Sequence, residues 1–413
     1  MTKTIDTIET IETTTRRRVL LAAFLLVAGT PLGARAVDEG ATPDRQAAPA
    51  RTAETSRPQG SASVGRFTLG VEAMAWWLQK SPIPIPLVTD GFLGDAGTNI
   101  LLGNEKLDTG THGGFRVTVA YAASERLGFE GSGFYASSRS TSRGVTSPGT
   151  LGSKDILLSF FDVTHGAESY TELSFSPLYA GSAQEEVTNS LGGAEVNATW
   201  ALPGGDCTRL QLLGGFRALR FRERFAFTTS SPYVPPEPLD VWTTSDEFDA
   251  RSDFYGLQVG ARARFGNGPL FGTVSAKVAL GAVSQHLDIK GGLVTNDFTD
   301  LKAEQTFAGG YLALPSNLGT ISRTSFAAVP ELELDLGYRL GSSVTLSAGY
   351  TLLWVSNVIR PGEQIDRNID PTQSVAYMYD PTATRTSQVR PAAGLHGTGL
   401  LAQSVRAGLS FRF

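Results

Sequence analysis

The chain of 413 residues contains a single cysteine, Cys207, and only three methionines and four histidines. One thiol cannot form an intramolecular disulfide, and no cysteine follows the N-terminal apolar run to accept a lipid, so neither a disulfide framework nor a lipid anchor is expected. Beyond that run the sequence has no stretch of roughly 18 apolar residues, which excludes a membrane-spanning helix. The formal net charge of -5 argues against nucleic acid as a partner.

The first 65 residues do not have the pattern of a folded domain. Three arginines at 16–18 precede an apolar run at 19–28 and the small-residue site Ala34-Arg35-Ala36, which predicts a secretory signal peptide over residues 1–36. A twin-arginine signal is the alternative. We favour the general secretory route, because a membrane barrel must stay unfolded until insertion. Residues 37–65 are rich in Ala, Pro, Ser and Glu without apolar periodicity, and we expect a disordered periplasmic leader.

Residues 66–413 contain stretches in which apolar and polar side chains alternate. In the last stretch Val405, Leu409 and Phe413 fall on one face and Arg406 and Arg412 on the other, the two-residue period of a strand. A strand with lipid on one side and a polar interior on the other has this pattern. Ten such stretches are predicted, at residues 66–78, 113–122, 126–137, 185–200, 208–227, 251–265, 270–288, 323–340, 343–355 and 401–413.

The connections between these stretches alternate between long and short. Short turns are expected at 123–125, 201–207, 266–269 and 341–342, whereas the other five connections are long. Bacterial outer-membrane barrels have short periplasmic turns and long outer loops. The sequence therefore predicts an all-β, transmembrane, antiparallel up-and-down β-barrel. A soluble β-sandwich is the alternative, but it would have turns of mixed length and solvated outer faces.

The sequence leaves the strand count open at one loop and suggests which aromatic residues lie at the membrane edges. The loop at 138–184 contains the apolar segments 155–161 and 170–178, which would raise the count from ten to twelve if they joined the barrel wall. Aromatic girdles are typical of the two membrane edges. The candidate girdle residues are Trp76, Trp77, Tyr350, Trp354 and Phe413.

Four segments resemble the putative β-barrel porin 7 family, outer-membrane barrels found mostly in planctomycetes. They are residues 93–103, 325–332, 349–351 and 356–366, and the stretch Arg360-Pro361-Gly362-Glu363-Gln364-Ile365-Asp366 is the most specific of them. The resemblance spans residues 67–413. It implies a barrel in the outer membrane of a Gram-negative cell envelope, and it implies no catalytic residue and no substrate.

The predicted inward faces carry eleven cations and six anions. These could be ion pairs that fill a narrow barrel, because charges held away from water must be paired, or they could line a water-filled path that favours anions. Eight strands leave room only for side chains and about 16 leave a channel, so with ten strands we expect a plugged or very narrow interior. The candidate lumen residues are Arg66, Glu72, Arg116, Arg126, Glu130, Glu195, Arg209, Arg217, Arg262, Arg264, Lys277, Glu331, Glu333, Asp335, Arg339, Arg406 and Arg412.

The stretch 284–288 places Ser284, His286 and Asp288 on one face of a predicted strand, the residue types of a hydrolytic triad. Residues two apart on a strand stand about 6 to 7 Å apart with parallel side chains, too far for the serine-to-base hydrogen bond. We therefore expect these three to be an ordinary polar strand end.

No metal site is expected. Residues 366–370 open like a calcium loop, but Pro371 replaces the turn glycine and Tyr377 the bidentate glutamate. His112, His165 and His396 lie in predicted loops without ligand partners, and the glycine-rich 394–399 opens a strand, which does not suit phosphate binding. The remaining acidic cluster, which could hold calcium but fits a solvated outer loop better, is Asp246, Glu247, Asp249 and Asp253.

Three functions follow from these features. The first is a porin-like, narrow or plugged conduit for small solutes, and the second is a structural or surface-interaction protein that acts through its long loops. The third and least supported is an outer-membrane hydrolase, so we expect neither an enzyme nor a cofactor. The apolar, proline-rich stretch 82–87 could be a plug or part of an outer cap. Expected partners are outer-membrane lipids, the barrel-assembly machinery through the C-terminal strand, and small solutes or extracellular molecules.

Overall fold

The structure, a computed structural model, describes residues 66–205, 207–234, 242–296, 303–382, 384–387 and 389–413. All of them belong to the compact unit Ala62–Phe413. The signal peptide and the leader predicted for residues 1–65 lie outside the described residues.

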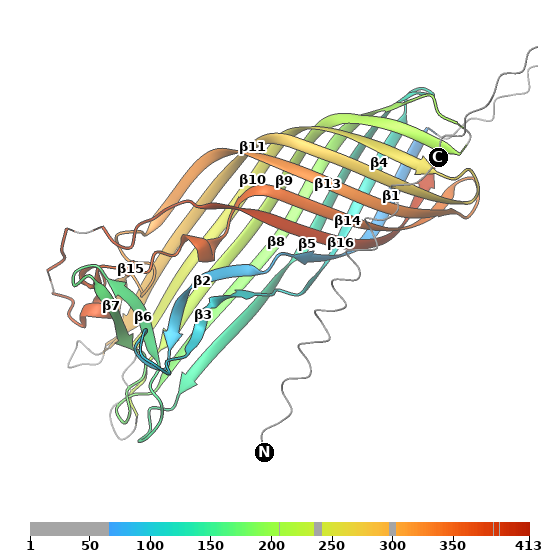
Figure 1. The fold of residues 1–413 in the computed structure, drawn as a ribbon. Coiled ribbons are helices and arrows are strands. Elements are labelled where there is room, and N and C mark those ends of the chain that lie inside the picture. The colour runs from blue at the N-terminus through green and yellow to red at the C-terminus, as the bar shows by residue number, and fades with distance from the viewer. Residues whose placement is uncertain (1–65, 206, 235–241, 297–302, 383, 388) are drawn as a thin grey trace, which may run out of the picture. The chain divides into compact units, whose positions relative to one another are not determined.

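Ten antiparallel strands form a closed barrel, as predicted. Neighbours in the ring are neighbours in the chain, and the pairing of the first strand with the last closes it (Figure 1). The barrel strands are β1 (Phe67–Leu78), β4 (Thr111–Ala122), β5 (Leu127–Ser147), β8 (Gly181–Ala201), β9 (Thr208–Ser230), β10 (Trp242–Phe265), β11 (Leu270–Thr295), β13 (Gly319–Arg339), β14 (Val344–Ile359) and β16 (Gly397–Arg412). One end of the barrel, here the turn end, holds the short turns and the C-terminus; the other, the loop end, holds the long connections.

An apolar band surrounds the barrel near its turn end. On β10, for example, the outward side chains of Tyr255, Leu257, Val259 and Phe265 are all exposed, by 48% or more. Ten residues at about 3.4 Å each, tilted by about 40°, span about 26 Å, close to the roughly 25 Å apolar band of outer-membrane barrels. The strand residues inside this band are therefore the membrane-spanning segments.

Several strands continue well beyond the apolar band toward the loop end. β11 extends to Thr295 although the prediction ended at 288, and β10 begins at Trp242 although the prediction began at 251. The outward residues on the β10 extension are polar, and of those on the β11 extension (Lys290, Gly292 and Val294) only Val294 is a large apolar residue, so the alternation typical of a lipid-facing strand is lost there. Asp246, Glu247 and Asp249, expected in or beside a loop, consequently lie within β10.

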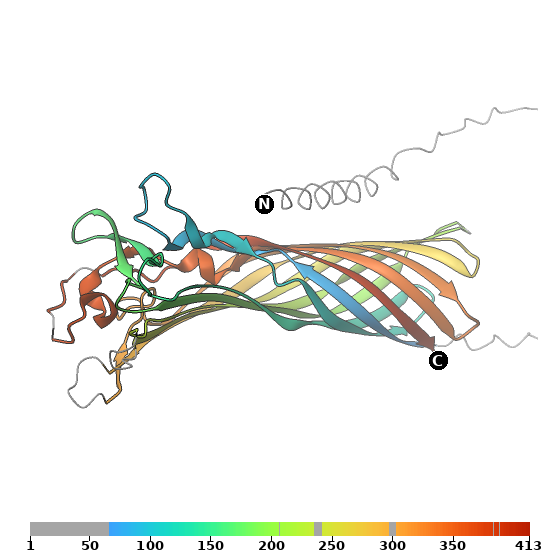
Figure 2. The same ribbon diagram turned by 90° about the horizontal axis from the view of Figure 1, so that it is seen from below.

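A second, smaller sheet lies at the loop end and settles the strand count. The segments that could have added a hairpin to the wall instead form β6 (Leu157–Asp162) and β7 (Ala167–Glu172), so the twelve-strand alternative is wrong. β6 pairs with β2 (Ser81–Thr89) and with β15 (Asn368–Ile369), and β2 also pairs with β3 (Ile100–Leu107). Figure 2 shows these elements at the end of the barrel opposite the C-terminus. We call this sheet and the loops around it the cap.

Short elements complete the loop end. They are β12 (Gln305–Ala308), which pairs with β11, the 3-10 helices η1 (Pro361–Gln364) and η2 (Pro371–Gln373), and the single-turn helix α2 (Val375–Met378). Within the described residues, no helix has the length and the apolar composition needed to cross a bilayer.

Candidate functional site

The interior of the barrel is arranged in layers, and the inner face of β9 passes through all of them. Cationic, apolar, acidic and aromatic side chains follow one another along this face because every second residue of a strand points the same way. From the turn end to the loop end the inward residues include Arg209, Arg217, Leu219, Phe221, Glu223, Phe225 and Phe227.

The first complete layer is a network of ion pairs, which we call the lumen layer. Strand register places partners directly opposite one another: Glu195 faces Arg217, and Lys277 faces Glu331. Side chains from nine strands meet here. The lumen layer consists of Glu72, Arg116, Glu130, Glu195, Arg217, Arg262, Lys277, Glu331, Glu333, Asp335 and Arg406.

Lys277 is the most connected cation of the lumen layer. Its Nζ lies 2.8 Å from Glu195, 2.6 Å from Glu331 and 3.4 Å from Glu333. Arg217 bridges Glu195 and Glu331, so these four groups form one continuous cluster with almost no solvent exposure. Buried charges of this kind are tolerated only when each has an opposite charge close by.

Three arginines tie the rest of the lumen layer together. Arg406 lies 2.6 Å from Asp335 and 3.3 Å from Glu72. Arg262 contacts Glu130 through two nitrogens at 2.7 and 2.9 Å, the fork-to-fork geometry that arginine and carboxylate favour. Arg116 pairs directly with Glu333. With five cations and six anions, the layer is nearly neutral.

Little space is left between these side chains. A cavity of about 10 Å³ lies beside Arg116, Glu195, Arg217 and Glu331, with Phe134 on its apolar side. Such a volume holds about one water molecule. Around this cavity the side chains of the lumen layer are therefore closely packed.

Six of the predicted lumen cations lie toward the turn end, outside the lumen layer: Arg66, Arg126, Arg209, Arg264, Arg339 and Arg412. Two of them share one aromatic ring. The guanidinium of Arg264 lies 3.5 Å and that of Arg339 5.4 Å from the ring centre of Phe271, in cation–π geometry. The excess of cations expected for the whole lumen is thus concentrated at its turn end.

An apolar layer lies on the loop-end side of the lumen layer. Its larger side chains are Met74, Trp76, Leu219, Phe221, Phe254, Val283, Val329 and Leu353. Trp76 was expected in the outer girdle, but it is completely buried and stacks on Phe134 at 5.1 Å. Trp76 points into the barrel and Trp77 points outward, because consecutive residues of a strand point to opposite faces.

The other girdle candidates lie on the outer surface. Trp77 and Trp354 are each 42% exposed near the loop-end edge of the apolar band, and Phe413 is exposed at the turn end. Tyr350 lies within the band rather than at its edge, and its hydroxyl donates to Gln403 Oε1 at 2.7 Å.

A buried arginine outside the predicted set connects the barrel to the cap. Arg360, at the end of β14, forms an ion pair with Glu223 at 2.6 Å, and both side chains are 1% exposed. It also donates to the carbonyls of Gln79 and Lys80 at 3.1 Å and to the Ser81 hydroxyl at 3.2 Å. Arg360 therefore fixes the passage from β1 into β2. The sequence signal was its place in the 360–366 motif, but Glu223 could not be assigned as its partner.

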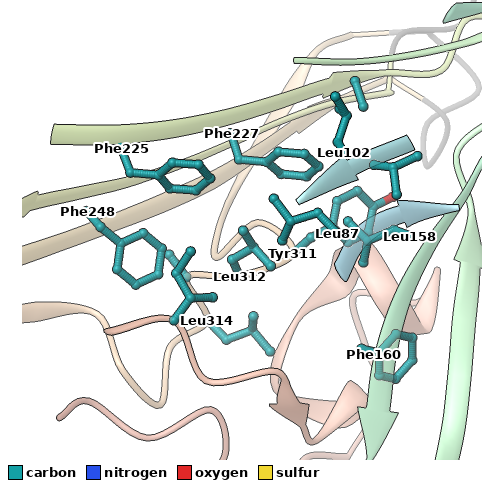
Figure 3. Packing of buried hydrophobic residues seen from close by; sticks show 14 of the residues in the cluster. Leu87, Leu102, Leu158, Phe160, Phe225, Phe227, Phe248, Tyr311, Leu312 and Leu314 are labelled. Carbon is teal, nitrogen blue, oxygen red and sulfur yellow. The ribbon is translucent and has the colours of Figure 1, made fainter. Parts of the chain in front are cut away.

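The cap packs on the inner wall of the barrel through an apolar core. Figure 3 shows Leu87 and Leu102 of the cap close to Phe225 and Phe227 of β9, with Leu312 and Leu314 near Phe248. The proline-rich stretch 82–87 forms most of β2, and its Ile83 and Leu87 are buried in this core. The stretch thus belongs to a cap that fills the mouth of the barrel.

Two carboxyl groups in this region have raised pKa values. Glu185 is fully buried, and its carboxyl group lies beside the Glu105 carboxyl and the backbone of Gly103. Burial and the nearby Glu105 carboxylate raise its pKa to about 8. Asp246 accepts backbone N–H groups of Tyr311, Leu312 and Ala313, yet complete burial outweighs these bonds and raises its pKa to about 7.

The Ser284 and His286 side chains approach more closely than expected. The Ser284 hydroxyl lies 3.1 Å from His286 Nε2, so the expected separation of 6 to 7 Å is wrong for this pair, whose side chains lean toward each other. Asp288 instead contacts Lys290 at 2.6 Å and Thr320 at 2.9 Å. The three residues do not form the hydrogen-bonded chain of a triad.

The acidic cluster divides between the two faces of β10. Asp246 points inward, whereas Glu247, Asp249 and Asp253 point outward and each pairs with an arginine of β9. Among the described residues, no group of three or more His, Cys, Asp or Glu side chains could hold a metal ion. His112 lies in β4 rather than in a loop, with its ring nitrogens close to Ser137 O and Thr109 Oγ1.

Solved structures with some similarity to the chain are outer-membrane proteins. The outer membrane protease OmpT from Escherichia coli is 11% identical with a TM-score of 0.42, and the match covers 86% of this chain and 99% of that one. A FadL homologue from Pseudomonas aeruginosa is 9% identical with a TM-score of 0.22, covering 85% and 91%. An anion-selective porin from Comamonas acidovorans is 11% identical with a TM-score of 0.18, covering 85% and 99%.

Sequence comparison gives one family. No protein with a curated description matches the chain significantly. The family described as "Putative beta barrel porin-7" matches residues 69–413, which is most of the chain and includes every barrel strand except the first two residues of β1. The chain therefore belongs to the putative beta barrel porin-7 family, a porin-like family of outer-membrane-type β-barrels.

Proposed function

We propose that this protein is an integral outer-membrane barrel with a closed lumen, which anchors its cap at the cell surface. The observation that carries this proposal is the layered interior: the lumen layer, the apolar layer and the cap core follow one another along the same inner wall. Each layer is made of close-packed side chains, so a solute would have to displace all three. This favours the surface-interaction alternative over a constitutive conduit.

The apolar band supports the membrane assignment. It has the height of an outer-membrane hydrocarbon layer, and aromatic side chains such as Trp77 and Tyr255 lie at its loop-end edge. In a bacterial barrel the short turns face the periplasm, so the turn end would be periplasmic and the cap extracellular. Outer-membrane lipids, and the barrel-assembly machinery acting on β16, are the partners that this placement implies.

An enzymatic role has little support in the geometry. Ser284 and His286 are in hydrogen-bond contact, but Asp288 is engaged by Lys290 and Thr320, so nothing orients the imidazole as in a triad. The family to which the chain belongs is also porin-like. We therefore propose a non-enzymatic function carried by the cap.

Two measurements test the proposal. Outer membranes should retain the protein after a carbonate wash, and it should migrate faster unboiled than boiled on a mildly denaturing gel; recovery from the soluble periplasm would contradict the membrane assignment. The folded protein in planar lipid bilayers should give no conductance or only a very small one. A large, stable and weakly selective conductance would instead establish an open lumen and support a diffusion porin.

A further inference from the structure

Charged side chains gather on the outer surface of the barrel immediately beyond the apolar band. They occupy consecutive outward positions of β9, β10 and β11, between the Tyr255 level and the cap. The cations are 44% to 65% exposed. This charged patch consists of Arg220, Arg222, Arg224, Glu247, Asp249, Arg251, Asp253, His286, Asp288 and Lys290.

The charged patch has sharp lateral limits. On the β8 side, Arg220, Arg222 and Arg224 lie opposite Gly192, Ser190 and Thr188. On the β13 side, the residues opposite Ser284, His286 and Asp288 are Thr324, Ser322 and Thr320. Along the row of Arg222, Arg251 and His286, the flanking outward residues are therefore the uncharged Ser190 and Ser322, whereas nearer the cap Glu186 of β8 is also charged.

One row of the patch places like charges directly opposite one another. Arg222 faces Arg251 across β9 and β10. Like charges in directly opposite positions destabilise a sheet. The neighbouring carboxylates relieve this in part, because Arg222 pairs with Asp249 and Arg251 with Asp253 at 3.0 Å. The patch has five permanent cations and four carboxylates, and Glu186, on the outward face of the adjacent strand β8, balances the remaining charge.

The guanidinium groups remain able to bind an additional anion. Arg220 contacts Asp253 through Nε at 2.5 Å and Arg224 contacts Glu247 through one terminal nitrogen at 2.7 Å. A guanidinium has five N–H donors, so several on each side chain face outward. The carboxylates hold the arginines along the barrel surface, and the free donors form an array suited to phosphate oxygens.

The height of the patch identifies the source of the phosphate. Arg251 lies four residues beyond Tyr255, which is about 10 Å above the edge of the apolar band for a tilted strand. The headgroup region is about 5 to 8 Å thick on each side of the hydrocarbon core. The row at Arg220 and Asp253, about 5 Å above the edge, lies within that region. The backbone of Arg251 lies above the region, but its side chain reaches back to Asp253 at 3.0 Å.

We propose that this face of β9, β10 and β11 binds the phosphate groups of an anionic lipid in the outer leaflet. The lipid's acyl chains would lie along the apolar band below Tyr255, and its phosphate would accept hydrogen bonds from Arg220 and Arg251, which both pair with Asp253 at the headgroup level. The inference rests on the proposed membrane placement, but it concerns the outside of the barrel and does not depend on whether the lumen is closed.

The test is a titration of the full-length barrel in neutral detergent micelles with dioctanoyl phosphatidic acid, dioctanoyl phosphatidylcholine and inorganic pyrophosphate. The variant Arg220→Gln/Arg251→Gln should bind phosphatidic acid about tenfold or more weakly than the unmodified protein. The matched control Lys154→Gln/Arg390→Gln, which removes two exposed loop cations, should bind it with unchanged affinity.

Four results would overturn the proposal. If both variants bound phosphatidic acid equally well, the arginines would not be part of the site. If the unmodified protein bound phosphatidylcholine as tightly as phosphatidic acid, acyl chains alone would account for the binding. Pyrophosphate binding as tight as that of phosphatidic acid would assign the site to free phosphate rather than lipid. No detectable binding of phosphatidic acid to the unmodified protein would also refute it. Carbonate-washed membranes that retain both variants show that barrel insertion is intact, so failure of this site and failure of the membrane assignment are distinguishable.

Discussion

Glu333 is the single residue whose loss should disturb the lumen layer most. It pairs directly with Arg116, and it also approaches Lys277 and Arg406. Changing Glu333→Ala leaves the Arg116 guanidinium without this carboxylate in a nearly closed interior. We expect the free energy of unfolding to fall by about 3 to 5 kcal/mol, measured by urea titration of the barrel in detergent micelles.

An exposed ion pair provides the comparison for Glu333→Ala. Lys154, which is 82% exposed, pairs with Asp90 at 3.4 Å in a loop. Changing Lys154→Ala should cost no more than about 1 kcal/mol, because water screens such pairs. If Glu333→Ala lowered the free energy of unfolding by as little as this, water would have to enter the lumen layer. An accompanying rise in the anion selectivity of conductance would indicate an open path.

Glu185 should make the stability of the loop end depend on pH. Burial and the Glu105 carboxylate raise its pKa in the folded protein to about 8 from an ordinary value of 4.5. Below the pKa of the unfolded state the carboxyl group is protonated in both states, and its contribution to stability is fully present. Between the unfolded and the folded pKa the folded protein holds the extra proton, so the free energy of unfolding falls by about 1.4 kcal/mol for each pH unit. The contribution is lost once the pH has risen through the folded pKa. Protease resistance of the cap should therefore decrease between pH 5 and pH 9.

The neutral variant Glu185→Gln separates this effect from general alkaline destabilisation. The glutamine cannot ionise, so the cap of this variant should lose less protease resistance between pH 5 and pH 9 than that of the unmodified protein, and the remaining loss would come from Asp246, whose pKa is about 7. The neighbour Glu186 points to the opposite face of β8, and Glu186→Gln should keep the pH dependence of the unmodified protein. An unchanged pH profile in Glu185→Gln would refute the assignment.

At the scale of elements, Arg360 should hold the cap to the barrel. Changing Arg360→Lys keeps the charge but removes the planar array that reaches Glu223 and the Gln79 and Lys80 carbonyls together. We expect limited proteolysis to cut the cap of Arg360→Lys faster, while the barrel keeps its heat-modifiable gel migration. Arg390→Lys, at an exposed pair with Asp366, is the control and should be cut at the unmodified rate.

The turns and loops give a topological prediction. Epitope tags inserted at Gly341 or Gly268, in the short turns, should be hidden from antibody in intact cells, whereas a tag at Leu151 should be accessible because that residue is 88% exposed at the loop end. Ser140, which the sequence places in a loop, lies in β5 and pairs with Thr188, so it is unsuitable for insertion. Surface labelling at Gly341 and not at Leu151 would show that the barrel has the opposite orientation in the membrane.

The barrel could be predicted from the sequence because its signal is local. Lipid on one side and a lumen on the other impose alternation on every membrane-spanning stretch, as at Val405 and Arg406, and the count of ten follows directly. The strand extensions at Trp242 and Thr295 escaped prediction because both of their faces avoid lipid. There the outward positions need no apolar residue.

The lumen could be predicted in composition but not in its pairing. Alternation identifies Glu195 and Lys277 as inward residues, yet their contact joins strands that are not neighbours in the barrel. Which inward residue meets which across the lumen depends on strand tilt and barrel closure, and these are properties of the whole barrel. For the same reason Glu223, on β9, could not be recognised as the partner of Arg360.

At the scale of the whole molecule, the closure of the lumen does not depend on the cap alone. The cap core contacts Phe225 and Phe227, but Phe221 of the apolar layer and Arg217 of the lumen layer lie further inside on the same strand. Each layer fills the barrel with side chains supplied by the wall itself. Under the proposed function, the cap is therefore a surface domain on a barrel whose lumen the wall's own side chains close.

This order of layers predicts the result of removing cap elements. A variant in which a short Gly-Ser linker replaces β2 and β3 (residues 81–107) should remain silent in planar bilayers, because Trp76, Phe254 and the ion pairs of Lys277 still close the lumen. Heat-modifiable gel migration should show that the variant is folded, and a known open porin in the same bilayers calibrates the measurement. A stable conductance that appears only in the variant would make the cap a gate, and the closed-barrel function would then give way to a gated conduit.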